Sequence, residues 1–399
     1  FAINTTHNDG HQFIPELIQR GVYNFVVNKN FDHRNFSNIN FIQVDDVLAT
    51  LQEIVACHRL EYNYPVIGIT GSNGKTTTKE LVAAVLSSHY KTYTTQGNLN
   101  NHIGVPLTIL SIKPDAEMAV IEMGANHLLE IDSYCSYALP NYGLITNCGK
   151  AHLEGFGSED GVKKGKGELF DFIKTHHGAV FLMADYEYLI NMSIGIDTVI
   201  TYGQNAGALR GTPHTQNGFL QVVFNQGTTI EKIQTQLVGD YNIPNVLAAV
   251  CIGIHFKIPD EKIIASIENY SPSNSRSQLV IWNNNEVILD AYNANPSSMK
   301  VAIENFSKLD KPNKVICLGG MKELGHESKM EHQILIDQLQ QYHWKQVILV
   351  GGDFISCQHP YLYFETAAEA KHWLQEQKFS KHTLLIKGSR GIQMEQLIA

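Results

Sequence analysis

A glycine-rich turn lies between an apolar segment and a helical one near residue 70. The apolar segment YPVIGIT is followed by GSNG and then by KTTTKELVAAVLSSH, whose apolar residues have helical spacing. Glycines in a strand–turn–helix unit let backbone N–H groups converge on phosphate oxygens, and the helix N-terminus adds the positive end of its dipole. The sequence therefore predicts a phosphate-binding loop formed by Gly71, Ser72, Asn73, Gly74, Lys75, Thr76 and Thr77.

The side chains that follow this turn suit a nucleotide triphosphate. Lys75 is expected to reach the β- and γ-phosphates, and the Thr76 hydroxyl is expected to bind Mg²⁺. The strict G-x-x-x-x-G-K-[ST] pattern is not met, because Ile69 occupies its first glycine position and Gly68 lies one residue earlier. The alternative is a glycine-rich turn without a ligand, which GKTTT directly after an apolar strand disfavours.

The rest of the chain alternates strand-like and helical segments, which is typical of mostly parallel α/β sheets. The polar stretch NYSPSNSRSQ interrupts this alternation, which restarts at EVILDAY with strands that end in glycine-rich turns. We predict an α/β protein of three domains. They are a short, truncated α/β N-terminal domain over 1–62, a central ATP-binding P-loop domain over 63–271 and a Rossmann-like C-terminal domain over 272–399.

Composition narrows the classes of function. Lys plus Arg is 30 and Asp plus Glu is 39, so the net charge of −9 disfavours a general nucleic-acid binder. No run approaches the ~18 apolar residues of a membrane span, and the first residues lack the features of a signal peptide. The six cysteines include no C-x-x-C pair and several lie in apolar stretches, which predicts reduced thiols and a cytoplasmic location.

Longer motifs make the family recognisable. The segments GITGSNGKTTTKE, GNLNNHIGVPLTIL and IEMGANH resemble the ATP-dependent Mur ligases of peptidoglycan synthesis. The resemblance continues through ITNCGKAHLEGFGS, GKGELF, GDYNIPNVLAA, LDAYNANPSSM, LGGMKELG and IKGSRG. DAYNANP is similar to the members that add D-alanyl-D-alanine to UDP-N-acetylmuramoyl-tripeptide, whereas members that add the third residue carry D-Y-A-H-T-P-D there. The resemblance implies an ADP-forming carboxylate–amine ligase that uses ATP and proceeds through an acyl phosphate.

The resemblance also implies catalytic and metal-binding residues. Glu122 and His152 are expected to bind two Mg²⁺ ions together with Thr76, and Lys166 matches the lysine that becomes carbamylated in the family. Each of these residues has a plainer interpretation. Glu122 could cap the next helix, His152 could be a surface histidine, and Lys166 could belong to a solvated basic helix face beside Lys163 and Lys164.

The nucleotide and substrate contacts are assigned by the same resemblance. Nucleotide contacts are expected from Asn242, Asn245, Arg276 and Asp290, although Tyr241 stands where the family usually has histidine. Substrate contacts are expected from Asn98, Asn100, Asn101, Asn126, Tyr292, Asn293, Asn295, Lys387, Ser389 and Arg390. The asparagines could instead be structural turn residues, and Lys387, Ser389 and Arg390 could form a plain turn with exposed charges.

Alternatives at the level of the whole protein stay open. One is another Mur or folylpolyglutamate-type ligase, and another is a non-catalytic P-loop binding module. The family's uridine-contacting D-[ST]-R segment is not found, which predicts weak binding of the UDP-sugar. We expect either a monomer or the ligase part of a fusion with an alanine racemase domain.

Overall fold

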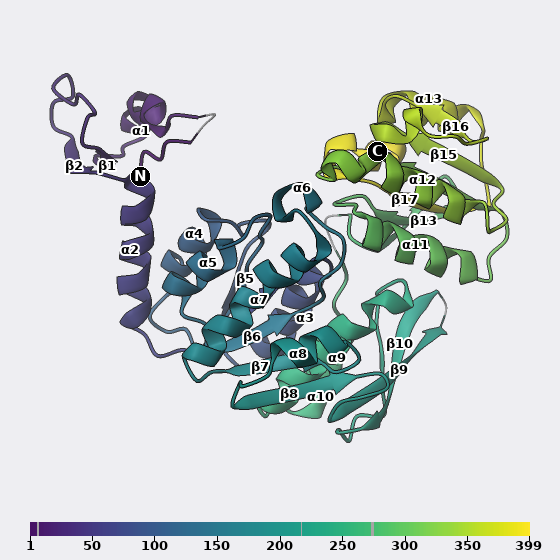
Figure 1. Ribbon diagram of the computed structural model, residues 1–399, viewed down its shortest axis with the longest axis horizontal. Helices are drawn as coiled ribbons and strands as arrows, with labels where there is room; N and C mark the ends of the chain where they lie inside the picture. The colour runs from purple at the N-terminus through teal and green to yellow at the C-terminus, as the bar shows by residue number, and fades with distance from the viewer. Residues whose placement is uncertain (6–7, 217, 273–274) are drawn as a thin grey trace.

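The computed structural model describes residues 1–5, 8–216, 218–272 and 275–399, and these residues form three sheets (Figure 1). The predicted α/β class with mostly parallel sheets is confirmed. No helix in the described ranges is long and apolar enough to cross a membrane. The limits of the three predicted domains, at 62 and 271, stay a prediction.

The first sheet is small and has its own core. Its parallel strands β1 (Asn24–Asn28) and β2 (Asn40–Val44) follow a short 3₁₀ turn, η1 (Gly10–Phe13), and helix α1 (Ile14–Gln19). Helix α2 (Val47–Leu60) then leads away from this sheet to the central part of the molecule (Figure 1). Asp46 caps α2 by accepting from the N–H groups of Leu48 and Ala49.

The central sheet has nine strands in the order β11-β10-β9-β8-β7-β6-β3-β5-β4. The strands are β3 (Val66–Thr70), β4 (Thr92–Thr94), β5 (Met118–Glu122), β6 (Tyr142–Ile145), β7 (Ala179–Met183), β8 (Thr198–Gly203), β9 (Leu209–Gln216), β10 (Phe219–Gln226) and β11 (Lys232–Gln234). Strands β3 to β9 pair in parallel, and β10 and β11 pair antiparallel. The chain leaves β3 toward β4 and β5 on one side and returns to β6 on the other, so β3 ends at a topological switch point where ligands bind in open α/β sheets.

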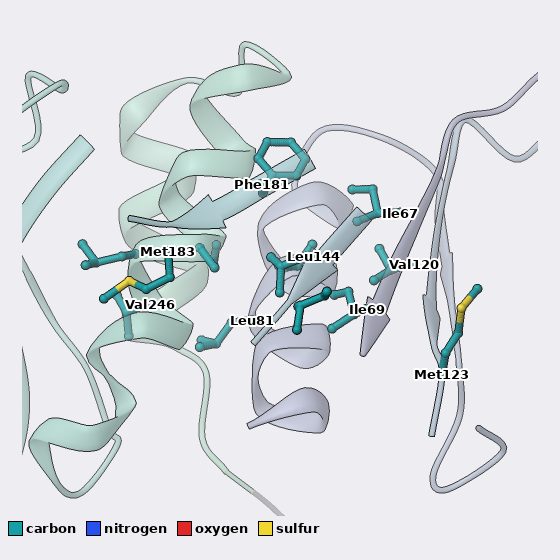
Figure 2. Close-up of a cluster of buried hydrophobic side chains, with 14 of the residues drawn as sticks. Ile67, Ile69, Leu81, Val120, Met123, Leu144, Phe181, Met183 and Val246 are labelled. Atoms are coloured by element: carbon teal, nitrogen blue, oxygen red, sulfur yellow. The ribbon is translucent and has the colours of Figure 1, made fainter. Parts of the chain in front are cut away.

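Helices cover both faces of this sheet. They are α3 (Lys75–Ser87), α4 (Gly104–Leu110), α5 (Glu130–Ala138), α6 (Leu153–Phe156), α7 (Glu159–Thr175), α8 (Glu187–Met192), the 3₁₀ turn η2 (Asp240–Asn242), α9 (Ile243–His255) and α10 (Asp260–Glu268). Figure 2 shows apolar side chains of β3, β5, β6 and β7 packed with Leu81 of α3 and Val246 of α9. All five residues of β3 are buried, which explains its continuous apolar sequence and fixes the strand that leads into the phosphate loop.

The C-terminal sheet has six strands in the order β12-β13-β17-β14-β15-β16, parallel except for β12. The strands are β12 (Gln278–Trp282), β13 (Asn285–Asp290), β14 (Lys314–Gly319), β15 (Gln346–Val350), β16 (Leu362–Phe364) and β17 (Thr383–Lys387). The helical segments are α11 (Pro296–Lys308), η3 (Gly325–Glu327), α12 (Ser328–Leu339), η4 (Gly352–Ser356), α13 (Ala367–Glu376), η5 (Arg390–Ile392) and η6 (Met394–Ile398).

Candidate active site

The glycine-rich turn connects the buried end of β3 to the first turn of α3. Gly71 has φ of 140°, and a Cβ atom there would lie 2.0 Å from Thr146 Oγ1. Gly74 caps α3 in the left-handed region with φ of 79°. Both positions therefore require glycine, and the backbone N–H groups at the start of α3 stay available for an anion, as a phosphate loop needs.

Lys75 folds back over this turn. Its Nζ donates to the carbonyl oxygens of Gly71 at 2.6 Å and Ser72 at 3.3 Å. Burial lowers the pKa of Lys75, and the nearby Glu122 carboxylate opposes that shift. The ammonium group is thus held over the loop, where a phosphate oxygen would replace the two carbonyl groups as its partner.

Glu122, the last residue of β5, faces the phosphate loop. Its side chain is buried, and Oε1 accepts from Thr76 Oγ1 at 3.1 Å and from Asn100 Nδ2 at 2.7 Å. Its second oxygen, Oε2, is buried and has no hydrogen-bond partner among the described residues. A buried carboxylate oxygen without a donor is costly, and a hard cation is the partner that such an oxygen suits. Thr76 and Glu122 therefore fit a Mg²⁺ ion, and the interpretation of Glu122 as a helix cap is not needed.

Lys166 lies on α7 and points into the protein. It is fully buried, its Nζ donates to the Ala125 carbonyl oxygen at 2.8 Å, and the amine lies 5.1 Å from the centre of the Phe156 ring. Burial, assisted by the charge of Lys75, lowers the pKa of Lys166 to about 7. The interpretation of Lys166 as part of a solvated basic face is wrong, because its side chain is buried. Of the three lysines on this part of α7, only Lys164 is exposed.

His152 lies at the edge of the central part, where it meets the C-terminal part. Its backbone is left-handed, with φ of 53°, and its Nδ1 is hydrogen-bonded to Glu323 Oε2. This contact lowers the pKa of Glu323. Across the described ranges, no group of three or more His, Cys, Asp or Glu side chains is placed to hold a metal ion by itself.

Several polar contacts join the phosphate loop to the C-terminal part. Asn295 Nδ2 donates to Asn73 Oδ1 at 2.8 Å, and Asn295 also caps α11. Ser297 Oγ accepts from the Lys150 N–H at 2.9 Å, and Lys150 Nζ pairs at 2.7 Å with Glu331, which is buried. The two parts thus meet directly around the loop.

A cavity of about 290 Å³ opens beside this junction. Arg276 stacks on the Tyr292 ring, with its guanidinium carbon 3.6 Å from the ring centre. Arg390 lies 5.2 Å from the same ring centre and donates to Tyr292 Oη at 3.4 Å. The cavity is lined by Thr76, Gly97, Asn98, Ser275, Arg276, Ala291, Tyr292, Arg390 and Glu395. Five predicted site residues, from segments far apart in the sequence, therefore line one space.

Four other predicted contacts are engaged within the protein. Asn245 Nδ2 donates to Asn242 Oδ1 at 3.0 Å, and its own Oδ1 accepts from Thr78 Oγ1 at 3.0 Å, so this pair joins α9 to α3. Asp290 and the buried Lys387 form an ion pair of 2.5 Å. These side chains can contact a ligand only with their remaining hydrogen-bonding capacity.

The remaining predicted substrate residues have local partners. Asn101 Oδ1 accepts from two N–H groups at the start of α4, and Asn293 Oδ1 accepts from the Ala294 N–H. Asn126 is exposed beside His127, and the buried Ser389 Oγ accepts from the Lys322 N–H. Asn98 is exposed and lines the cavity. Asn101 thus has the local bonds of a turn residue, and the substrate contacts of these residues stay a prediction.

Comparison with known proteins fits this geometry. Residues 69–253 match the Mur ligase middle domain, and residues 275–390 match the Mur ligase, glutamate ligase domain. The chain is 32% identical to a UDP-N-acetylmuramoyl-tripeptide--D-alanyl-D-alanine ligase of Bacillus subtilis, covering 98% of this chain and 87% of the relative. The chain belongs to the Mur ligase family. A ligase of the same name from Escherichia coli is 31% identical and matches all of this chain and 89% of its own length.

Solved structures of the Mur ligase family have the same fold. A crystal structure of MurF from Acinetobacter baumannii superimposes with a TM-score of 0.89 at 27% identity, over 99% of this chain and 88% of that one. MurF ligase from Thermotoga maritima in complex with ADP gives a TM-score of 0.89 at 23% identity, over 99% of this chain and 92% of that one. At 23% identity, the likeness to the Thermotoga maritima structure supports the fold alone.

Sequence reasoning about this Mur ligase missed several residues of the site. Asn147 follows β6, and its Oδ1 accepts from the Asn73 N–H at 3.1 Å. Its position just after a buried parallel strand could have indicated it, because the carboxyl ends of such strands meet at one edge. Glu323 and Glu395 lie in contact with the site from the C-terminal part. Glu323 belongs to LGGMKELG, one of the motifs of the family resemblance, but that resemblance assigns it no role, and QMEQL around Glu395 carries no signal for such a position.

Proposed function

We propose that this Mur ligase joins D-alanyl-D-alanine to UDP-N-acetylmuramoyl-tripeptide in peptidoglycan precursor synthesis, using ATP. The relatives named above carry this activity in their names and match nearly the whole chain. The observation that carries the proposal is that Thr76 of the phosphate loop, which donates to Glu122, lines a cavity shared with the C-terminal part. Such a place can hold a triphosphate, a carboxylate and an amine together.

The reaction first activates the carboxylate, because a carboxylate reacts poorly with amines. The γ-phosphoryl group of ATP is transferred to the terminal carboxylate of the tripeptide, which gives an acyl phosphate and ADP. The amine of D-alanyl-D-alanine attacks the acyl carbon, and the tetrahedral intermediate collapses to the amide and inorganic phosphate. The N–H groups of the loop, Lys75 and Arg276 offset the negative charge that these steps bring together.

The metal-binding residues of this proposal are Thr76 and Glu122 for one Mg²⁺ ion and His152 with modified Lys166 for a second. The unpartnered Oε2 of Glu122 supports the first site. Bound Mg²⁺ would supply charge neutralisation between phosphate oxygens. At the second site, His152 presents its remaining ring nitrogen, because Nδ1 is engaged by Glu323.

Carbamylation of Lys166 is the finer part of the proposal. The neutral amine adds CO₂ and loses a proton, which turns a buried cation into an anionic oxygen ligand. Full burial and the low pKa of about 7 supply the neutral amine that this reaction needs. We expect ¹³C-bicarbonate to give a carbamate carbon signal by NMR in the wild type and none in Lys166→Arg. A signal that survives in Lys166→Arg would refute the assignment.

The remaining contacts follow the family's pattern. We propose Asn242, Asn245, Arg276 and Asp290 for the nucleotide, and the asparagines of GNLNNHIG and the DAYNANP and KGSRG segments for the two other substrates. The chain then works as three domains, with limits near 62 and 271. All six cysteines are free thiols, which supports a reducing compartment such as the cytoplasm.

Phosphate release tests the proposed function. We expect release with ATP, UDP-N-acetylmuramoyl-tripeptide and D-alanyl-D-alanine together, and loss of release when any one of the three is omitted. Glu122→Gln should bind the substrates but lose Mg²⁺-dependent release, since an amide oxygen is a weaker ligand than a carboxylate. Release that does not depend on the dipeptide, or a fully active Glu122→Gln, would contradict the proposal.

A further inference from the structure

One carboxylate in the cavity is unexplained by phosphate chemistry. The cavity holds the guanidinium groups of Arg276 and Arg390, which suit anionic ligands, and it is also lined by Glu395. Glu395 Oε2 is buried and has no hydrogen-bond partner among the residues that the structure describes. A carboxylate here repels the phosphates of ATP and suits a ligand group that donates hydrogen bonds and carries positive charge.

Glu395 lies in η6 between residues that are anchored in the core of the C-terminal part. Met394 and Leu397, on either side of it in η6, are fully buried in the core of the C-terminal part. Gln393 adopts a left-handed conformation, with φ of 59°, between η5 and η6. This reversal lets Arg390 on η5 and Glu395 on η6 line the same cavity although they are five residues apart. One short segment thus contributes both a cation and an anion to the lining of the cavity.

We infer that Glu395 binds the ammonium group of the incoming D-alanyl-D-alanine. The inference rests on the proposed function and extends it by naming a substrate-binding residue for the amine. A dipeptide is a zwitterion, so its ammonium group supplies the donors that Oε2 lacks, while Arg390 on the neighbouring turn offers a partner for its carboxylate. Glu395 therefore selects an acceptor with a free amino group at this side of the cavity.

The test separates the acceptor from the activation step. In Glu395→Gln we expect KM for D-alanyl-D-alanine to rise by about 10- to 100-fold, as the loss of a charged hydrogen bond predicts. KM for ATP and for UDP-N-acetylmuramoyl-tripeptide should stay unchanged. Hydroxylamine, which is uncharged at neutral pH, traps the acyl phosphate as a hydroxamate without the dipeptide. The rate of hydroxamate formation by Glu395→Gln should match that of the wild type, and this match also shows that the variant is folded.

Two further variants complete the design. Glu395→Asp keeps the charge on a shorter side chain, so its KM for the dipeptide should lie between those of the wild type and Glu395→Gln. Glu365→Gln, on an exposed residue of the same part of the chain, should leave every KM unchanged. An unchanged KM for the dipeptide in Glu395→Gln would overturn the inference. A raised KM for ATP with a matching loss of hydroxamate would also overturn it, by assigning Glu395 to the nucleotide.

Formation of the hydroxamate and of the amide by the wild type distinguishes failure of this inference from failure of the proposed function. If the wild type makes the hydroxamate and the amide but Glu395→Gln behaves identically, only the assignment of Glu395 is refuted. If the wild type makes neither product with all substrates present, the proposed function is refuted and the inference falls with it.

Discussion

Replacing Lys166 by methionine should change how stability depends on pH. The pKa of Lys166 is lowered from 10.5 to about 7 in the folded protein, chiefly by burial. Below pH 7 both folded and unfolded chains carry the proton, so the folded protein bears the full cost of a buried ammonium. Between pH 7 and 10.5 the unfolded chain binds more protons than the folded one. The stability of the wild type therefore rises with pH across this window.

The size of the effect follows from the shift in pKa. A shift from 10.5 to about 7 corresponds to a penalty of about 5 kcal/mol at low pH. Of this penalty, about 2 kcal/mol is relieved between pH 7 and pH 9. Lys166→Met has no ionisable group, so it avoids the penalty but leaves the Ala125 carbonyl without its donor, a pH-independent cost of about 1–3 kcal/mol. We expect the variant to be more stable than the wild type at pH 7, with an advantage that shrinks by about 2 kcal/mol at pH 9.

The assay is urea unfolding of both proteins between pH 6 and pH 9 in buffers free of CO₂. Unfolding should be followed by near-ultraviolet circular dichroism of the buried tyrosines Tyr134, Tyr137 and Tyr202 of the central part. The three tryptophans of the chain all lie beyond residue 281 and would report on the C-terminal part. Lys164→Met, on the exposed face of the same helix, is the matched control and should track the wild type at every pH. Parallel pH curves for Lys166→Met and the wild type would refute the reasoning.

Three other substitutions test the loop and its junction with the C-terminal part. Gly71→Ala should lower the melting temperature and abolish ATP binding, because its Cβ would lie 2.0 Å from Thr146 Oγ1 at φ of 140°. Asn295→Ala removes a helix cap and the contact with Asn73, so we expect a loss of about 1–2 kcal/mol in stability and a raised KM for ATP. Arg276→Ala should raise KM for ATP with little change in melting temperature, since Arg276 lines the cavity.

Each substitution has a control. Gly21→Ala places a Cβ at another glycine of positive φ, 84°, with no atom within 4 Å, and should leave ATP binding intact. Asn295→Asp keeps an oxygen to cap α11 but loses the amide donor to Asn73. We therefore expect it to keep the stability of the wild type and to raise KM for ATP. ATP binding by Gly71→Ala, or an unchanged KM for ATP in Asn295→Asp or in Arg276→Ala, would contradict these assignments.

The phosphate loop could be predicted because its determinants are local. The apolar residues of β3, the glycines that need positive φ and the start of α3 follow one another within about twenty residues. The same holds for the strand-like and helical segments, whose apolar spacing reflects burial on one face or both. The burial of Lys166 could not be predicted in this way. GVKKGKGE contains three lysines, and only packing against Phe156 and the Ala125 carbonyl decides which of them points inward.

The contacts that complete the site are long-range, and their sequence separation explains why the sequence does not reveal them. Asn73 and Asn295 are 222 residues apart, and Lys150 and Glu331 are 181 apart. No local pattern encodes such pairs, since each asparagine or charge is equally suited to solvent. The same limit applies to the hydrogen bonds that link Asn245 to Asn242 and to Thr78, which the sequence does not reveal; the nucleotide contacts of both asparagines stay a prediction.

The junction between the two parts bears directly on the order of the reaction. Thr76 contributes to the cavity from the phosphate loop, whereas Arg276, Tyr292, Arg390 and Glu395 contribute from the C-terminal part. Separation of the two parts would therefore leave the loop able to bind phosphates but would remove two guanidinium groups and one carboxylate from their vicinity. Catalysis that needs both sets of groups therefore requires the two parts to meet around the loop, as they do in this structure.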